Sequence, residues 1–267
     1  MPSGDRLASN DDLLAARAEA AGEIELAAHH ILPEPIHGVD IAPIAGQRSH
    51  IGHAGVQIER AHRMAHGLAA AGVAGPAGDW STGAAFFDAD GVCDLDLLVC
   101  TYVAWSRRID LEVDFRLTGL GRAYGGPEHH VGALNRLYRN DGGGRFTEVS
   151  QAAGIAVTEG SDRQPAGKAL AVSVADLDDN GWVDIVVAND TTRNFLYRNL
   201  GDGRFEEISA LEGIAYDREG RATSGMGIDI ARFRNDADVG IAIGNFANEM
   251  SSLFVTLDGR GPFVDEA

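Results

Sequence analysis

The chain has 267 residues, 45% of them hydrophobic, and carries 40 acidic against 22 basic side chains, a formal charge of −18 at pH 7. This acidic excess argues against nucleic acid or an anionic membrane surface as a partner, because both are held mainly by Lys and Arg. Two cysteines exclude a disulfide framework, and no apolar run is long enough to predict a membrane span. The first residues, MPSGDRLASNDD, have neither the charged nor the apolar region of a secretory signal.

Residues 1–78 form an Ala- and His-rich leader that we expect to be part-helical or disordered. Helical patterns cover residues 11–31 and 56–73, and the stretch 72–78 (GVAGPAG) predicts a linker. Two histidines four apart on a helix can share a metal, but the pair in this leader has no Glu between them as in H-E-x-x-H. We therefore interpret the cluster as part of the leader rather than a zinc-type site; it comprises His29, His30, His37, His50, His53, His62 and His66.

The first element after the leader, residues 83–102, predicts a strand, an Asp-rich loop and a second strand. Loop positions 1, 3 and 9 are acidic, but Val92 and Cys93 replace a polar residue at position 5 and a glycine at position 6. The acid at position 7 is a candidate to compensate for these losses. The weaker candidate metal ligands are therefore Asp88, Asp90, Asp94 and Asp96.

A long insertion, roughly residues 102–133, follows this element. Long connections on a rigid scaffold often carry function. His129 and His130, with Tyr124 and Glu128, make a candidate acid/base set for polysaccharide cleavage, because His titrates near neutral pH. A binding surface and a purely structural loop are the alternatives, since adjacent residues on a strand usually point apart.

A repeated hairpin comes next. Residues 135–155 and 194–214 are identical at 13 of 21 aligned positions, and a weaker copy begins at Ser252. Each copy has an alternating strand, a Gly-rich turn and a short strand that starts at a Phe, which predicts a β-hairpin. The unit is too short to bury its own face, so neighbouring copies must stack.

The second unit begins with residues 168–190, which contain the best-formed Asp loop. Alternating oxygen-bearing side chains on a tightly turning loop converge on one point, and the glycine at position 6 permits the turn. This chemistry suits Ca²⁺. An EF-hand does not fit, because position 12 is Val187 and the flanks are strands. An Asx-turn cluster without metal is the simpler alternative. The candidate ligands are Asp176, Asp178, Asn180, Asp184 and the carbonyl of Trp182.

The third unit, residues 226–246, keeps the strand–loop–strand pattern but has lost most of its acids. Arg232 and Arg234 stand at positions 1 and 3, and Gly240 stands at position 9. An arginine in place of a ligand supplies positive charge internally, so we predict no metal in this loop.

Each unit of about 57–59 residues therefore predicts four strands, the content of one β-propeller blade. The sequence predicts an all-β chain with a short helical leader and a partial β-propeller of about three blades. The blades are expected at about 81–155, 166–214 and 223–267, with the last one incomplete.

The paired motifs, D-x-D-x-[DN]-G-x-x-D between strands and then N-x-L-Y-R-N-x-G-[DG]-G-x-F, resemble the VCBS/FG-GAP repeats of integrin-α-like β-propellers. More narrowly, residues 81–267 resemble bacterial relatives of cartilage acidic protein, which often carry an ASPIC/UnbV domain. The resemblance implies a Ca²⁺-stabilised propeller that is commonly secreted, periplasmic or at the cell surface. It also implies ligands at Asp176, Asp178, Asn180 and Asp184, and less securely at Asp88, Asp90 and Asp96.

Two departures from this family pattern concern completeness. Such propellers close with six or seven blades, and no ASPIC/UnbV region follows the repeats. We therefore expect a truncated chain, or one that completes its ring with further blades or by self-association.

Three functional hypotheses follow. The first is a non-catalytic calcium-binding module for recognition or adhesion, with an extracellular protein or glycan as ligand. The second is a polysaccharide-active enzyme that uses the 102–133 insertion, and the third is a non-functional fragment of a longer propeller protein.

Overall fold

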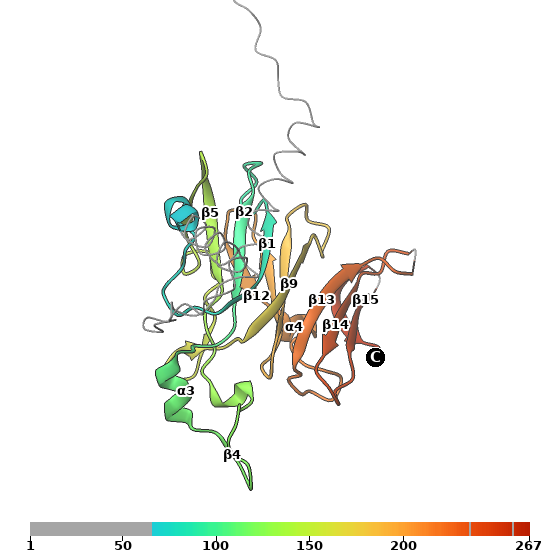
Figure 1. Ribbon diagram of the computed structural model, residues 1–267. Helices are drawn as coiled ribbons and strands as arrows, with labels where there is room; N and C mark the ends of the chain where they lie inside the picture. Colours follow the sequence, from blue (N-terminus) through green and yellow to red (C-terminus); the bar gives the residue numbers. More distant parts are fainter. Residues whose placement is uncertain (1–65, 235, 258) are drawn as a thin grey trace, which may run out of the picture.

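The computed structural model describes residues 66–234, 236–257 and 259–267. Three four-stranded antiparallel sheets stand side by side in these residues (Figure 1), and we call them blades 1, 2 and 3 in chain order. The leader histidines other than His66 and the helix expected at 11–31 lie outside the described residues. The all-β prediction is confirmed, and the three sheets form an arc that does not close into a ring within the described chain.

Within every blade the four strands follow one another in sheet order, as a meander. Blade 1 consists of β1 (Ser81–Phe87), β2 (Asp96–Thr101), β5 (Arg136–Gly142) and β6 (Arg145–Glu148). Blade 2 consists of β9 (Ala169–Ala175), β10 (Asp184–Asn189), β11 (Phe195–Asn199) and β12 (Phe205–Glu207). Blade 3 consists of β13 (Gly225–Ala231), β14 (Gly240–Asn245), β15 (Ser252–Leu257) and β16 (Arg260–Asp265).

Blade 3 differs from the prediction of an incomplete last blade. Its fourth strand pairs with β15 in the register Phe254↔Asp265, Val255↔Val264 and Thr256↔Phe263. The strand is hard to recognise from sequence because Pro262 interrupts its pattern, and a proline supplies no N–H to the ladder. The sheet places that residue on its edge strand, where a missing donor is tolerated.

Short elements fill the connections. The insertion of blade 1 contains helix α3 (Arg107–Val113), the two-stranded hairpin β3 (Arg116–Leu117) and β4 (Gly121–Arg122), and the 3₁₀ helix η1 (Pro127–His129). The connection into blade 2 holds β7 (Thr158–Glu159) and β8 (Gln164–Pro165), and α4 (Ser209–Glu212) follows blade 2. No helix among the described residues is long and apolar enough to cross a membrane.

Two apolar cores lie between the blades, and β10 contributes to both. Ile185 and Val187 belong to the core shared with blade 1. Val186 and Ala188 belong to the core shared with blade 3. All six residues of β10 are buried for this reason, since side chains on a strand alternate between its two faces.

A turn motif recurs at each blade and extends the repeat into the leader. Residues 68–74 (LAAAGVA), 150–156 (SQAAGIA) and 209–215 (SALEGIA) share a left-handed glycine, and we call each of them a tail turn. A Cβ added at this glycine would lie 2.4–2.5 Å from the carbonyl oxygen of the first Phe in a fourth strand. The three glycine–Phe pairs are Gly72 with Phe146, Gly154 with Phe205, and Gly213 with Phe263.

The segment 72–78, expected to be a linker, docks on blade 1 at its first residue, Gly72, whereas residues 74–78 are exposed. The helical residues 66–71, cyan in Figure 1, lie beside β5. Arg136 also pairs with Asp79 at 2.6 Å. Small residues and glycines suggest a flexible linker, but at Gly72 the missing side chain permits a close backbone approach.

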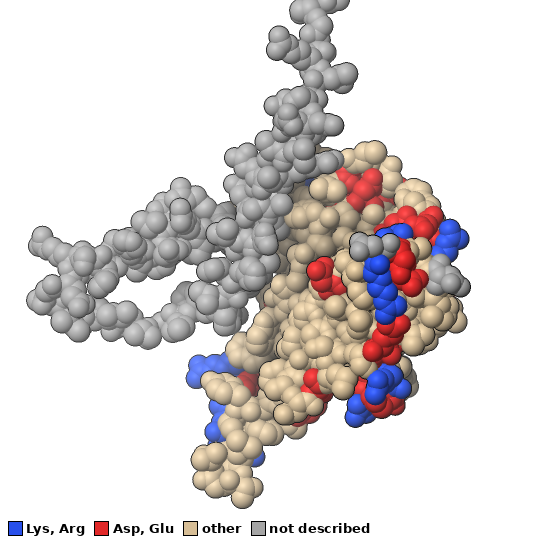
Figure 2. Space-filling view, turned by 90° about the vertical axis from the view of Figure 1, so that its right-hand side faces the viewer, with Lys and Arg blue, Asp and Glu red and all other residues tan. Residues whose placement is uncertain are grey.

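The outer side of blade 3 has a different character from the buried joints. Figure 2 views the molecule from this side and shows mostly uncharged surface, interrupted by acidic and basic side chains. On β13 and β14 the exposed residues include Ala231, Ala242 and Gly244.

Candidate metal site

The loop between β9 and β10, which we call the main loop, brings three predicted ligands together. One carboxylate oxygen from each of Asp176, Asp178 and Asp184 lies within 4.8 Å of the others. The backbone helps to hold them: Gly181 N–H donates to Asp176 Oδ2 at 2.9 Å, and Asn180 N–H donates to Asp178 Oδ1 at 3.2 Å. Gly181 has φ +89°, the left-handed conformation for which the sequence supplies a glycine.

Two further predicted ligands lie in the same loop. Asn180 is exposed, and its Oδ1 accepts a hydrogen bond from Trp182 N–H at 2.7 Å. The indole of Trp182 points to blade 1: a Cβ added at Gly91 would lie 2.5 Å from the ring, and one added at Gly201 would lie 2.7 Å from it. Sequence reasoning identified the backbone of Trp182 but missed this packing role.

Asp184 is the deepest member of the main loop, with 2% of its surface exposed. Its Oδ2 accepts from Leu177 N–H at 3.0 Å, and its Oδ1 accepts from Asn199 N–H at 2.8 Å. Burial raises the pKa of Asp184 to about 6, and the nearby charges of Asp178 and Asp176 add to the rise, although the two backbone donors oppose it. A cation would relieve both causes of the raised pKa.

The loop between β1 and β2, which we call the first loop, repeats this geometry. Asp88, Asp90 and Asp96 place one oxygen each within 4.8 Å of the others. Asp96 is 1% exposed, and its pKa is raised mainly by burial. Cys93 takes the left-handed conformation of Gly181, with φ +67°, and its N–H donates to Asp88 Oδ2 at 3.0 Å. The loss of glycine from the sequence has therefore not changed the path of this loop.

Asp94 does not join the three clustered carboxylates of the first loop. Its Oδ1 is buried without a hydrogen-bond partner among the described residues. Its charge adds to the rise in the pKa of Asp96, so the side chain lies near the cluster although outside it.

The loop between β13 and β14 directs its arginines to other acids. Arg232 Nη2 lies 3.2 Å from Asp179 Oδ1 of the main loop, and Arg234 pairs with Glu266 near the end of the chain. Of the two arginines that stand at ligand positions in this loop, Arg232 therefore links blade 3 to the main loop.

The donor sets of the two loops suit a hard divalent cation. Each offers three carboxylates, and the chemistry of carboxylate and carbonyl oxygens matches Ca²⁺, which takes six to eight oxygen ligands. A hollow of about 330 Å³ between blades 2 and 3 borders Asp178 and Asp184, two of the three clustered acids of the main loop. Arg198 Nε, 3.5 Å from Asp178 Oδ2, reduces but does not cancel the local negative charge.

The histidines of the insertion are not arranged as an acid/base pair. His129 Nε2 lies 3.5 Å from Glu128 Oε1, and its ring lies against Phe115 with centroids 5.0 Å apart. His130 Nδ1 is buried and has no hydrogen-bond partner among the described residues. Tyr124 is almost fully exposed.

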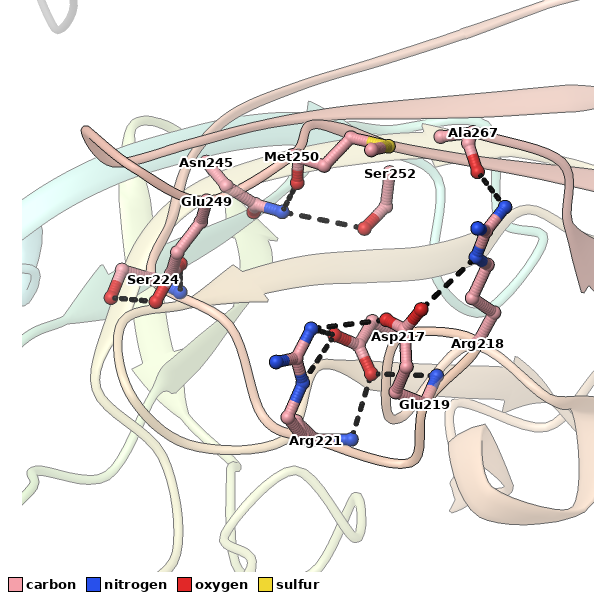
Figure 3. Close-up of polar contacts among 10 residues, drawn as sticks. All are labelled: Asp217, Arg218, Glu219, Arg221, Ser224, Asn245, Glu249, Met250, Ser252 and Ala267. Carbon is pink, nitrogen blue, oxygen red and sulfur yellow. Dashed lines mark hydrogen bonds and ion pairs between the residues drawn. The ribbon is translucent and has the colours of Figure 1, made fainter.

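A second hollow, of about 340 Å³, lies between the connection into β13 and the loop after β14 (Figure 3). Its charges are paired internally, because Arg221 binds Asp217 at 2.9 Å and Glu219 at 3.0 Å. Glu249 is held by Ser224 N–H at 2.6 Å. No motif in the sequence pointed to this hollow, whose lining holds four acidic side chains against two arginines and so keeps a net negative charge.

Two stretches of the chain, residues 123–187 and 176–242, match the family described as FG-GAP-like repeat. Over 107 residues the chain is 29% identical to Cartilage acidic protein 1 of Xenopus tropicalis. That alignment covers 40% of this chain and 16% of the relative, so the chain corresponds to a small part of the relative's length. The main loop lies in the matched region, whereas the first loop lies before it.

Proposed function

We propose that this chain, in which residues 123–242 match FG-GAP-like repeats, is a calcium-dependent, non-catalytic module for recognition or adhesion. Its ligand is an extracellular protein or glycan, and its place is secreted, periplasmic or at the cell surface. The repeat family supports the recognition role. The two carboxylate clusters support the calcium dependence.

The observation that carries the proposal is the pair of buried carboxylates at loop position 9. Asp96 and Asp184 are almost completely buried, yet each lies beside two further acids. Burying a carboxylate among like charges is costly unless a cation compensates. Calcium in both loops would turn this cost into a gain that exists only in the folded state.

Thermal unfolding in EDTA and in excess Ca²⁺ tests the proposal. At a calcium concentration 100 times the dissociation constant, one site adds about 2.7 kcal/mol of stability. For a domain of this size that is a rise in Tm of about 5–10 °C. Asp178→Asn should remove much of the rise, whereas Asp202→Asn, which alters an exposed acid in the β11–β12 turn, should keep it.

Equal Tm values in EDTA and in calcium would refute the metal component. Turnover of a polysaccharide in a broad glycan panel, lost on His129→Ala, would refute the non-catalytic component. Cell fractionation tests the proposed location independently of both.

A further inference from the structure

Asn199, at the end of β11, connects the carboxylate loops of two neighbouring blades. It is 1% exposed and makes four hydrogen bonds. Three stay within blade 2: its N–H donates to Asp184, its Nδ2 donates to Val183 O at 3.1 Å, and its Oδ1 accepts from Gly201 N–H at 2.9 Å. The fourth crosses the joint, from Nδ2 to Ala89 O in the first loop at 3.1 Å.

These bonds form a continuous path between the two buried carboxylates. Ala89 N–H donates to Asp96 Oδ2 at 2.9 Å, and the carbonyl of the same residue accepts from the Asn199 amide. Asn199 N–H then donates to Asp184 Oδ1 at 2.8 Å. Saturated carbons separate the two bonded groups within Ala89 and within Asn199, so the link is mechanical: a shift of Ala89 moves the Asn199 side chain, and with it the N–H that holds Asp184.

Blade 1 contains an internal control for this residue. Asn140 occupies the same place and makes the same three bonds within its blade: to Asp96, to Leu95 O at 3.0 Å and from Gly142 N–H at 2.9 Å. It makes no bond to another carboxylate loop within the described residues. The cross-blade bond is therefore specific to Asn199.

Side-chain packing joins the same two loops. The Trp182 indole of the main loop contacts Gly91 of the first loop directly. The β11–β12 turn adds a second contact, since a Cβ at Gly203 would lie 3.3 Å from the Cβ of Asp90. Movement of either loop on binding an ion is therefore transmitted to the other by contact as well as by hydrogen bonds.

We propose that Asn199 is a positioning residue that couples calcium binding in the first loop to calcium binding in the main loop. The inference rests on the proposed function, since it requires ions in both loops. Binding in either loop orders the Ala89–Asn199 path and so favours binding in the other, and thermodynamic linkage makes the effect equal in both directions.

Calorimetric calcium titrations of the full chain test the coupling. The first loop is disabled by Asp88→Asn with Asp90→Asn, in the wild-type, Asn199→Thr and Asn140→Thr backgrounds. Threonine is a suitable replacement because Thr256 holds the equivalent register position in blade 3, where it binds Val239. The Asn140→Thr background controls for loss of the within-blade bonds.

Disabling the first loop should weaken calcium binding at the main loop about fivefold in the wild-type and Asn140→Thr backgrounds, and less than twofold in Asn199→Thr. Disabling the main loop should weaken the first loop by the same factor. An equal effect in all three backgrounds, or no effect, overturns the coupling alone. A wild-type main loop that binds no calcium overturns both the coupling and the proposed function.

Discussion

Replacing Gly72 by alanine tests whether the tail turn at 68–74 docks on blade 1 as the other two tail turns dock on blades 2 and 3. The residue has φ +84°, and an L-residue in that conformation costs about 1–2 kcal/mol. The added Cβ would also lie 2.5 Å from Phe146 O, a backbone atom that cannot rotate away. Overpacking of this kind costs about 1–3 kcal/mol, so we expect a total loss of about 2–5 kcal/mol.

Gly220→Ala separates the two contributions. Gly220 has φ +77°, but a Cβ added there meets no atom within 4 Å. Its substitution should therefore cost only the conformational part, about 1–2 kcal/mol. Gly154→Ala and Gly213→Ala should match Gly72→Ala, because their Cβ atoms would lie 2.4 and 2.5 Å from equivalent carbonyls.

Urea unfolding of the four variants, followed by circular dichroism and fluorescence, measures these losses. If Gly72→Ala costs no more than Gly220→Ala, while Gly154→Ala and Gly213→Ala cost more, residues 68–74 do not dock on blade 1. The repeat would then begin at β1.

Two further predictions concern titratable groups. The pKa of Asp184 is raised to about 6, so in the ion-free protein its contribution to stability is greatest below its unfolded pKa and is lost as pH rises through 6. Calcium must displace that proton, so its affinity should fall about tenfold for each pH unit below 6. The rise in Tm caused by calcium should therefore be constant at pH 7–8 and smaller at pH 5. An unchanged rise at pH 5 would contradict this. Cys93 is exposed, whereas burial raises the pKa of Cys100 to about 12. A thiol reagent should therefore modify one cysteine in the native protein and two in denaturant, and rapid modification of both natively would show that the blade 1–blade 2 core is open.

The sequence predicted those features that depend on spacing within one segment. Asp176, Asp178 and Asp184 converge because positions 1, 3 and 9 of a turning loop face one point, and this follows from local geometry. The hairpin at 194–214 likewise follows from alternation and a Gly-rich turn.

Features that depend on contacts between blades were not predictable in this way. Asn199 has the same sequence context as Asn140, and only the position of Ala89 on the neighbouring blade distinguishes them. The tail turn at 68–74 is identical to that at 150–156 at four of seven positions, but all four are Ala or Gly, which do not by themselves predict docking. Its role became visible only from the approach of a Phe carbonyl.

The double burial of β10 bears on how the repeat copies have diverged. The residues of β14 that face blade 2, Ile241 and Ile243, are as large as or larger than Ile185 and Val187 in β10. On the opposite face, register places Ala242 and Gly244 where β10 has Val186 and Ala188. Side-chain volume has been kept where a neighbouring blade fills the joint and lost where the sheet faces solvent. The two faces of β14 thus differ in side-chain volume, as expected for a strand of which only one face is packed against a neighbouring blade.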